Sequence, residues 1–134
     1  MRSFEFQVVT NCPLETAFAV YMDIDRWRNR SVFGDIRWVQ GEPWEEGSRL
    51  HIETRHPISS SVDQVLQHFE MNRRVAYISH VFGMTCETRV GFASLSANQT
   101  SIHVRMQLVG TASRVLGFAV EPAIAKATKD FLKN

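Results

Sequence analysis

The residue types best suited to proton transfer stand singly along this chain rather than in clusters. A histidine changes charge near neutral pH, so any one of them could move a proton, although a place on a strand face or edge is the simpler interpretation of each. His56 is the strongest candidate, because it continues the apolar side of its strand beside Thr54 and could donate a proton to a ligand or accept one from it. The five histidines stand at positions 51, 56, 68, 80 and 103.

A second candidate group lies in the segment from 75 to 82. With Tyr77 turned inward, its ring would form a flat apolar wall and its hydroxyl could orient a ligand. The alternative is a core tyrosine bonded to a neighbouring group. The register of the strand is also open, since the opposite register would admit His80 to the interior instead. The first register groups Val75, Tyr77, Ser79 and Val81, and the second groups Ala76, Ile78, His80 and Phe82.

Glu87 and His103 could form an acid–base pair, but the alternation of their segments places them opposite the apolar sides. Arg89 and Arg105 fall on the same side as these two residues. We therefore expect cross-strand charge pairs on the solvent face rather than catalysis. The sequence contains no Gly-rich phosphate loop, nucleophile elbow or zinc-ligand spacing, so we expect no metal and no cofactor.

Alternating apolar and polar residues over most of the chain predict strands joined by short turns. Such strands form an antiparallel meander, and the overall class is α+β. Apolar residues at helical spacing predict a short helix after the first strand, a further helical turn, and a long helix at the end. The predicted strands cover 4–10, 35–40, 49–56, 61–70, 75–82, 85–94 and 101–109, and the helices 13–22, 24–30 and 112–134.

The last predicted helix carries one apolar stripe that must pack on the sheet. If the sheet curves around this helix, the space between them becomes a pocket. Gly117 and Pro122 weaken the first part of the helix, which predicts that residues 112–121 can shift as a lid. The stripe consists of Leu116, Val120, Ile124, Ala127 and Phe131.

Length and charge fit one domain over residues 1–134, with a formal net charge of +1. This balance argues against nucleic-acid binding, which relies on clustered positive charge. We expect no signal peptide and no membrane span, hence a cytoplasmic protein. Cys12 and Cys86 have no C-x-x-C spacing, so reduced thiols are expected rather than a disulfide, and Cys86 is most simply a small buried hydrophobe.

The order of elements, with four local motifs, resembles the START-like (SRPBCC, Bet v 1-like) superfamily, in particular its polyketide cyclase/dehydrase-like branch. The resemblance implies a helix-grip fold, in which about seven curved antiparallel strands wrap around a long C-terminal helix, with two short helices after the first strand. It covers essentially the whole chain, but its motifs mark turns and packing rather than catalysis. They are Cys12-Pro13, Asp25-Arg26-Trp27, the segment 41–48, and the segment 69–77 with Met71 where the family often has Pro.

The resemblance and the apolar inward sides predict a cavity that binds a hydrophobic small molecule, such as a lipid, an isoprenoid or a polyketide-like aromatic. A cyclase, aromatase or dehydratase activity, with His56 and Tyr77 as catalytic candidates, is the first alternative. A protein-interaction or co-chaperone role, using exposed Trp38 and Trp44, is the second. The protein is expected to be a monomer or homodimer. The predicted ligand-binding residues are Trp27, Phe33, Ile52, Thr54, His56, Tyr77, Ser79, Thr88, Val104, Met106, Val120 and Ile124.

Overall fold

Seven antiparallel strands form one sheet in the order β1-β7-β6-β5-β4-β3-β2. The computed structural model describes residues 2–28, 33–55, 59–81 and 83–110. From β2 to β7 each strand pairs with the next, and β1 pairs with β7, so the predicted meander is confirmed. The elements are β1 (Arg2–Thr10), α1 (Leu14–Met22), α2 (Ile24–Arg28), β2 (Phe33–Gln40), β3 (Arg49–Thr54), β4 (Ser60–Glu70), β5 (Arg74–Val81), β6 (Met84–Ser96) and β7 (Gln99–Gly110).

Several sequence-based predictions fall outside the described residues. These are the long helix at 112–134 with its stripe and lid, and His56. Among the described elements, several strand ends differ from the prediction, for example in β2 and β6. β2 begins at Phe33 rather than 35, because a register shift between Phe33 and Ile36 interrupts the alternation that would have indicated it. β6 extends over Met84–Ser96, beyond the predicted 85–94.

The two helices after β1 form for local reasons. Pro13 occupies the position before α1 in an extended conformation, and its carbonyl accepts the first helical bond from Ala17 at 2.9 Å. Asp23 ends α1 and starts α2, because its side chain accepts the backbone N–H of Asp25 at 3.1 Å. Arg28 then fixes α2 on β2 by donating to the carbonyl of Ile36.

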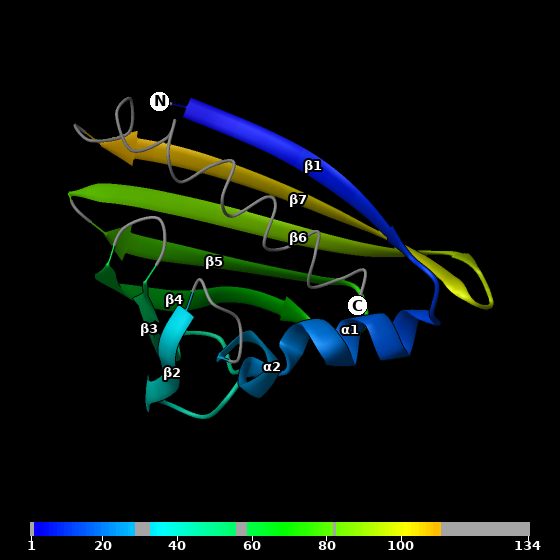
Figure 1. Cartoon of the computed structure of the whole chain (residues 1–134), viewed down its shortest axis with the longest axis horizontal. Helices are drawn as coiled ribbons and strands as arrows, with labels where there is room; N and C mark the ends of the chain where they lie inside the picture. The colour runs from blue at the N-terminus through cyan, green and yellow to red at the C-terminus, as the bar shows by residue number, and fades with distance from the viewer. Residues whose placement is uncertain (1, 29–32, 56–58, 82, 111–134) are drawn as a thin grey trace.

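The sheet curves, and both helices lie along one side of it (Figure 1). Register shifts occur in β2 and, between Leu66 and His68, in β4. Such bulges bend a strand and increase its twist, which accounts for part of the curvature. We call the face on which α1 packs, with Phe18 against Phe69 and Phe92, the inner face.

Two hydrophobic clusters cover the inner face. The main core combines α1 with β1 and β4 to β7, and the second core is built on β2 and β3. Trp27 of α2 packs against both clusters, so it connects them. The second core consists of Ile36, Leu50 and Ile52, and the main core of Phe6, Val8, Ala17, Phe18, Tyr21, Leu66, Val75, Met84, Cys86, Val90, Phe92, Ile102, Val104, Met106 and Leu108.

Candidate functional site

Five polar side chains lie together on the inner face of the sheet, across β4, β5 and β6. Tyr77 lies opposite Thr88, and Ser79 lies opposite Cys86 on one side and Gln64 on the other. Antiparallel partners share a face of the sheet, so these five residues form one patch. We call them the polar patch. Its location resolves the open register of β5: Val75, Tyr77 and Ser79 point inward.

His80 points outward, as that register requires. It is exposed, and its ring lies 3.3 Å from the hydroxyl of Thr85 on the outer face. Met84 is a residue that the sequence analysis did not place inside. It is buried at the start of β6, on the same face as Cys86. The predicted strand begins one residue later, at 85. Extending its alternation from Cys86 to residue 84 would have placed Met84 on the inner face.

The hydroxyl of Tyr77 lies 3.2 Å from the hydroxyl of Tyr21. Tyr21 comes from α1, and its ring makes edge contacts with Trp27 at 5.4 Å and Phe92 at 5.5 Å between centroids. Tyr21 is not among the site residues predicted from the sequence. A buried tyrosine usually needs a hydrogen-bond partner for its hydroxyl, and this need could have indicated a polar neighbour opposite α1. The partner is 56 positions away in the chain.

Burial disfavours the charged forms of the ionisable groups in this site. Loss of solvent raises the pKa of Tyr21 to about 12, although its bond to Tyr77 opposes the shift. Burial, together with the Tyr21 hydroxyl, raises the pKa of Tyr77 well above its ordinary value. Burial also raises the pKa of the Cys86 thiol, whose sulfur lies 3.7 Å from the Thr88 hydroxyl. Near neutral pH these groups are therefore hydrogen-bonding groups rather than bases or thiolate nucleophiles.

Trp27 and Phe33 border this region on the side of α2 and β2. Their rings meet edge to face, with centroids 5.9 Å apart. The indole N–H of Trp27 donates to the carbonyl of Tyr21 at 2.7 Å, which ties α2 to the end of α1. Both rings are half-buried. Their role at the rim of a ligand site stays a prediction.

Exposure varies systematically across the inner face. Val75, Val90 and Ile102, beneath α1, are 0–1% exposed. Tyr77 keeps an intermediate exposure, as do Gln64 and Val62 toward the second core. Ser79, Cys86 and Thr88 of the polar patch are only 2–7% exposed. A molecule reaching the inner face would therefore first meet Tyr77 and Gln64 of the patch and the side chains between the two cores.

The other predicted ligand-binding residues separate into two groups. Ile52 and Thr54 lie on β3, at the second core, and the Thr54 hydroxyl is 3.1 Å from that of Ser60. Val104 and Met106 lie on β7 in the main core, and Met106 is opposite Thr88. The structure thus brings Tyr77, Ser79, Thr88 and Met106 together. Val120 and Ile124, like His56, lie outside the described residues.

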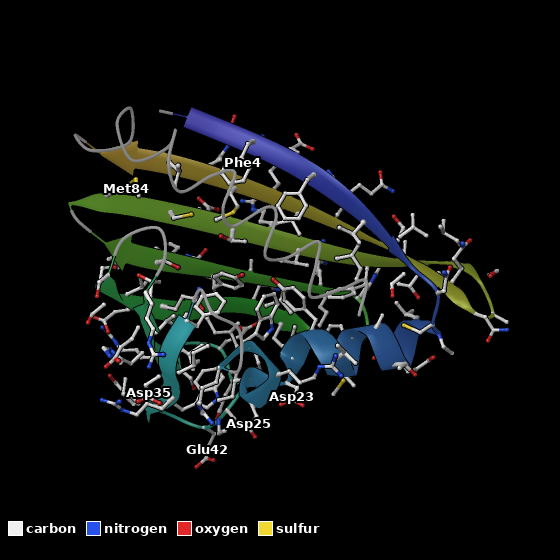
Figure 2. The ribbon with its side chains drawn as sticks, in the orientation of Figure 1. Phe4, Asp23, Asp25, Asp35, Glu42 and Met84 are labelled. Carbon is white, nitrogen blue, oxygen red and sulfur yellow. The ribbon has the colours of Figure 1, made fainter. Side chains whose placement is uncertain are left out.

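Charged side chains occupy other parts of the described structure. Among the inner-face side chains that it describes, none is charged. Figure 2 shows Phe4 and Met84 over the sheet, whereas Asp23, Asp25, Asp35 and Glu42 lie at the side of α2 and β2. The inner face can therefore contact a neutral apolar molecule without leaving a buried charge unpaired.

Glu87 and His103, considered as an acid–base pair, are not brought together. Glu87 lies opposite Gln107 and is bonded to Arg89 of its own strand at 3.0 Å. His103 pairs across strands with Glu5 at 2.7 Å. The expected cross-strand pairing on the outer face is thus seen for His103 but not for Glu87.

Trp38 and Trp44 differ from the expectation of exposed tryptophans. Both are half-buried, and their rings meet edge to face with centroids 5.1 Å apart. Trp44 also stacks on Phe69, at 6.1 Å and an interplanar angle of 26°. This packing removes the feature that favoured a protein-interaction role.

Two further observations bear on the kind of site. Within the ranges that the structure describes, no group of three or more His, Cys, Asp or Glu side chains could hold a metal ion. The described helices are too short or too polar to cross a bilayer. Cys12 and Cys86 are both free.

Solved structures show which fold this is, although no family model and no curated protein sequence matches the chain. An aromatase/cyclase from Streptomyces sp. R1128 superposes with a TM-score of 0.82 at 12% identity, over 98% of this chain and 90% of that one. A START superfamily protein from Mycobacterium smegmatis gives 0.76 at 11% identity, over 97% and 96%. Norcoclaurine synthase from Thalictrum flavum gives 0.77 at 6% identity, over 98% and 91%.

These likenesses confirm the fold that the resemblance implied. The curved sheet of seven antiparallel strands, with two short helices after the first, is the START-like (SRPBCC, Bet v 1-like) fold. At such low identities the likeness extends to the fold alone. The activity has to be argued from this chain's own residues.

Proposed function

We propose that this protein binds a hydrophobic small molecule against the inner face of its sheet, beside the Tyr21–Tyr77 pair. The observation that supports this most is the polar patch itself. Its hydroxyls, thiol and amide form one group on a face that is otherwise mainly apolar and whose described side chains carry no charge. Apolar walls with a few convergent polar groups are typical of small-molecule sites.

The class of ligand follows from the apolar residues near the polar patch. Trp27, Phe33 and Met106 offer aromatic and thioether surface to a ring or an isoprenoid chain. The proposal therefore covers a lipid, an isoprenoid or a polyketide-like aromatic. A cytoplasmic location and a monomeric or dimeric state stay predictions from the sequence.

Ligand binding is tested first on the purified protein. Native mass spectrometry should reveal a co-purifying molecule, and thermal denaturation should detect stabilisation by members of a panel of lipids and aromatics. A ligand at 100 times its dissociation constant stabilises the folded state by about 2.7 kcal/mol. An empty protein that no member of a broad panel stabilises would count against the proposal.

A substitution that places a larger side chain on the inner face tests where the ligand binds. Thr54 faces inward on β3, and its neighbour Glu53 faces outward. Thr54→Phe should lower ligand affinity by occupying inner space, and Glu53→Phe, the matched control, should not. Unchanged affinity in Thr54→Phe would place the binding site elsewhere, and an equal loss in both variants would show an effect that is not specific to the inner face.

A second function, cyclase, aromatase or dehydratase activity, is favoured by one specific observation. Two neutral hydroxyls 3.2 Å apart could polarise a ligand carbonyl, as donors do that stabilise a developing oxyanion. The solved structures of similar fold include an aromatase/cyclase. No base faces inward among the described side chains, so His56 would have to supply one. A His56→Ala variant with full turnover on a genuine substrate would remove it from this scheme.

A further inference from the structure

We infer that the Tyr77 hydroxyl is the polar anchor of the ligand site, and that with Tyr21 behind it the site selects molecules carrying a neutral hydrogen-bond acceptor over carboxylates. A ketone, ester or ether oxygen is such an acceptor. The inference rests on the proposed function and specifies the chemistry of its ligand. Tyr77 would contact the ligand, and Tyr21 would be a positioning residue.

The two hydroxyls differ in what surrounds them. Tyr21 is 7% exposed, and its ring is held between those of Trp27 and Phe92. Tyr77 keeps an intermediate exposure and lies between Thr88 and Leu66 on the neighbouring strands. Tyr77 is therefore the less buried of the two residues, and the one that a ligand on the inner face would reach first.

Hydrogen counting favours donation from Tyr21 to Tyr77. Each hydroxyl has one hydrogen, and among the described residues each has the other as its hydrogen-bond partner. If Tyr77 donated to Tyr21, the hydrogen of the more buried hydroxyl would have no acceptor, which is costly. If Tyr21 donates to Tyr77, the free hydrogen is on the hydroxyl of the less buried residue, where a ligand entering beside Tyr77 could accept it. The bond from Tyr21 also polarises Tyr77 and makes it a stronger donor.

The surroundings disfavour an anionic acceptor. The described inner-face side chains provide no cation, and a carboxylate brought there would lose its hydration without gaining an ion pair. The raised pKa values of both tyrosines have the same cause, loss of solvent around a group that would become negative. A neutral oxygen loses far less hydration and still accepts the hydrogen bond.

Three probes built on the same naphthalene ring test this preference: 2-acetylnaphthalene, 2-ethylnaphthalene and 2-naphthoate. Dissociation constants are measured by titration calorimetry on the full chain. We expect the ketone to bind about five- to tenfold more tightly than the ethyl compound, the effect of one hydrogen bond, and the carboxylate to bind most weakly.

Hydroxyl deletions assign the effect to the pair. Tyr77→Phe should abolish the advantage of the ketone over the ethyl compound while leaving affinity for the ethyl compound within about twofold. Tyr21→Phe should reduce the advantage of the ketone without removing it. A loss of packing alone would weaken both compounds and leave the ratio of their dissociation constants unchanged. Thr85→Val, which deletes a hydroxyl on the outer face of β6, is the matched control and should leave all three constants unchanged.

A second measurement needs no variant. The chain has two tyrosines, Tyr21 and Tyr77, so labelling the ring carbon that bears the hydroxyl gives two NMR signals, both from this pair. The ketone should shift the Tyr77 signal more than the ethyl compound does.

The outcomes separate the two proposals. Equal affinity for ketone and ethyl compound, or tightest binding of the carboxylate, would overturn the anchor while leaving hydrophobic binding intact. If none of the three probes binds, the anchor is overturned, and the ligand panel described above decides whether the proposed function falls with it.

Discussion

At the scale of single residues, the tyrosine pair makes the largest difference to what the inner face can do. Without it, the proposed site between the two cores would offer an apolar molecule no hydrogen bond to orient it. A buried hydroxyl with a satisfied bond gives direction at little cost, whereas an unsatisfied one would destabilise the fold. The pair is therefore a specificity element as well as a packing element.

The raised pKa values predict a characteristic loss of stability at high pH. An unfolded tyrosine releases its proton near pH 10, whereas folded Tyr21 keeps it to about 12 and folded Tyr77 also well beyond its ordinary value. The pair's contribution is thus fully present below pH 10 and is lost as pH rises above it, because the unfolded state then binds fewer protons. Each tyrosine should lower the free energy of unfolding by about 1.4 kcal/mol per pH unit in this range.

Ultraviolet absorbance of tyrosinate and denaturant unfolding at each pH check this prediction. Since both tyrosines of the chain belong to the pair, the absorbance reports on nothing else. A Tyr21→Phe/Tyr77→Phe double variant serves as control, because lysine and cysteine titration is common to both proteins. Tyrosinate formation in the folded protein near pH 10 would contradict the burial of the pair.

Sequence reasoning reached part of this site and could not reach the rest. Tyr77 and Ser79 were grouped correctly by strand alternation, yet the competing apolar set at 76, 78 and 82 left their direction open. Only pairing with Thr88 and Cys86 settles it, and that depends on the register between two strands. Tyr21 was missed because helical spacing shows which face of α1 packs, not what lies opposite a given hydroxyl.

At the scale of elements, order and type were predictable because hydrophobic period and turn residues are local properties. The seven strands and the two short helices all follow from them. Strand ends were less predictable where bulges interrupt the alternation, as in β2. The aromatic contacts of Trp38 and Trp44 were not predictable, because the turn that brings them together is shaped by backbone conformation rather than by period.

That turn, from β2 to β3, depends on Gly41. Gly41 has a φ of +78°, and a Cβ there would lie 2.3 Å from the Ser48 hydroxyl. Ser48 is buried and donates to the carbonyl of Glu42 at 2.7 Å, so it has little room to move. Gly41→Ala should therefore destabilise the protein by about 2–4 kcal/mol, combining backbone strain with the loss of this bond.

Gly47 provides a matched control within the same turn. Its φ is +89°, but a Cβ there would meet nothing within 4 Å. Gly47→Ala should cost only the backbone strain, about 1–2 kcal/mol. Denaturant midpoints of the two variants measure the difference. Equal destabilisation would show that Ser48 yields easily and that the close approach at Gly41 is unimportant.

At the scale of the whole molecule, one continuous sheet carries two hydrophobic cores of unequal size. The main core has contributions from α1 and five strands, whereas the second rests on three buried residues of β2 and β3. Local stability follows the amount of buried apolar contact, so the part with the smaller core should open more readily than the rest. The proposed ligand site lies between the two, where such opening would admit a molecule.

Amide hydrogen exchange tests this division, with β3 as the reporter because it is paired on both sides, unlike the edge strand β2. We expect β3 amides to exchange faster than those of β6, and a bound ligand to slow them toward the β6 rate. Trp27→Leu should widen the difference, since Trp27 packs against both cores, while Trp38→Leu perturbs the second core without touching that connection. If Trp27→Leu accelerated exchange in β3 and β6 equally, the two cores would unfold as one unit, and entry of a ligand by local opening of the β2–β3 region would have no basis.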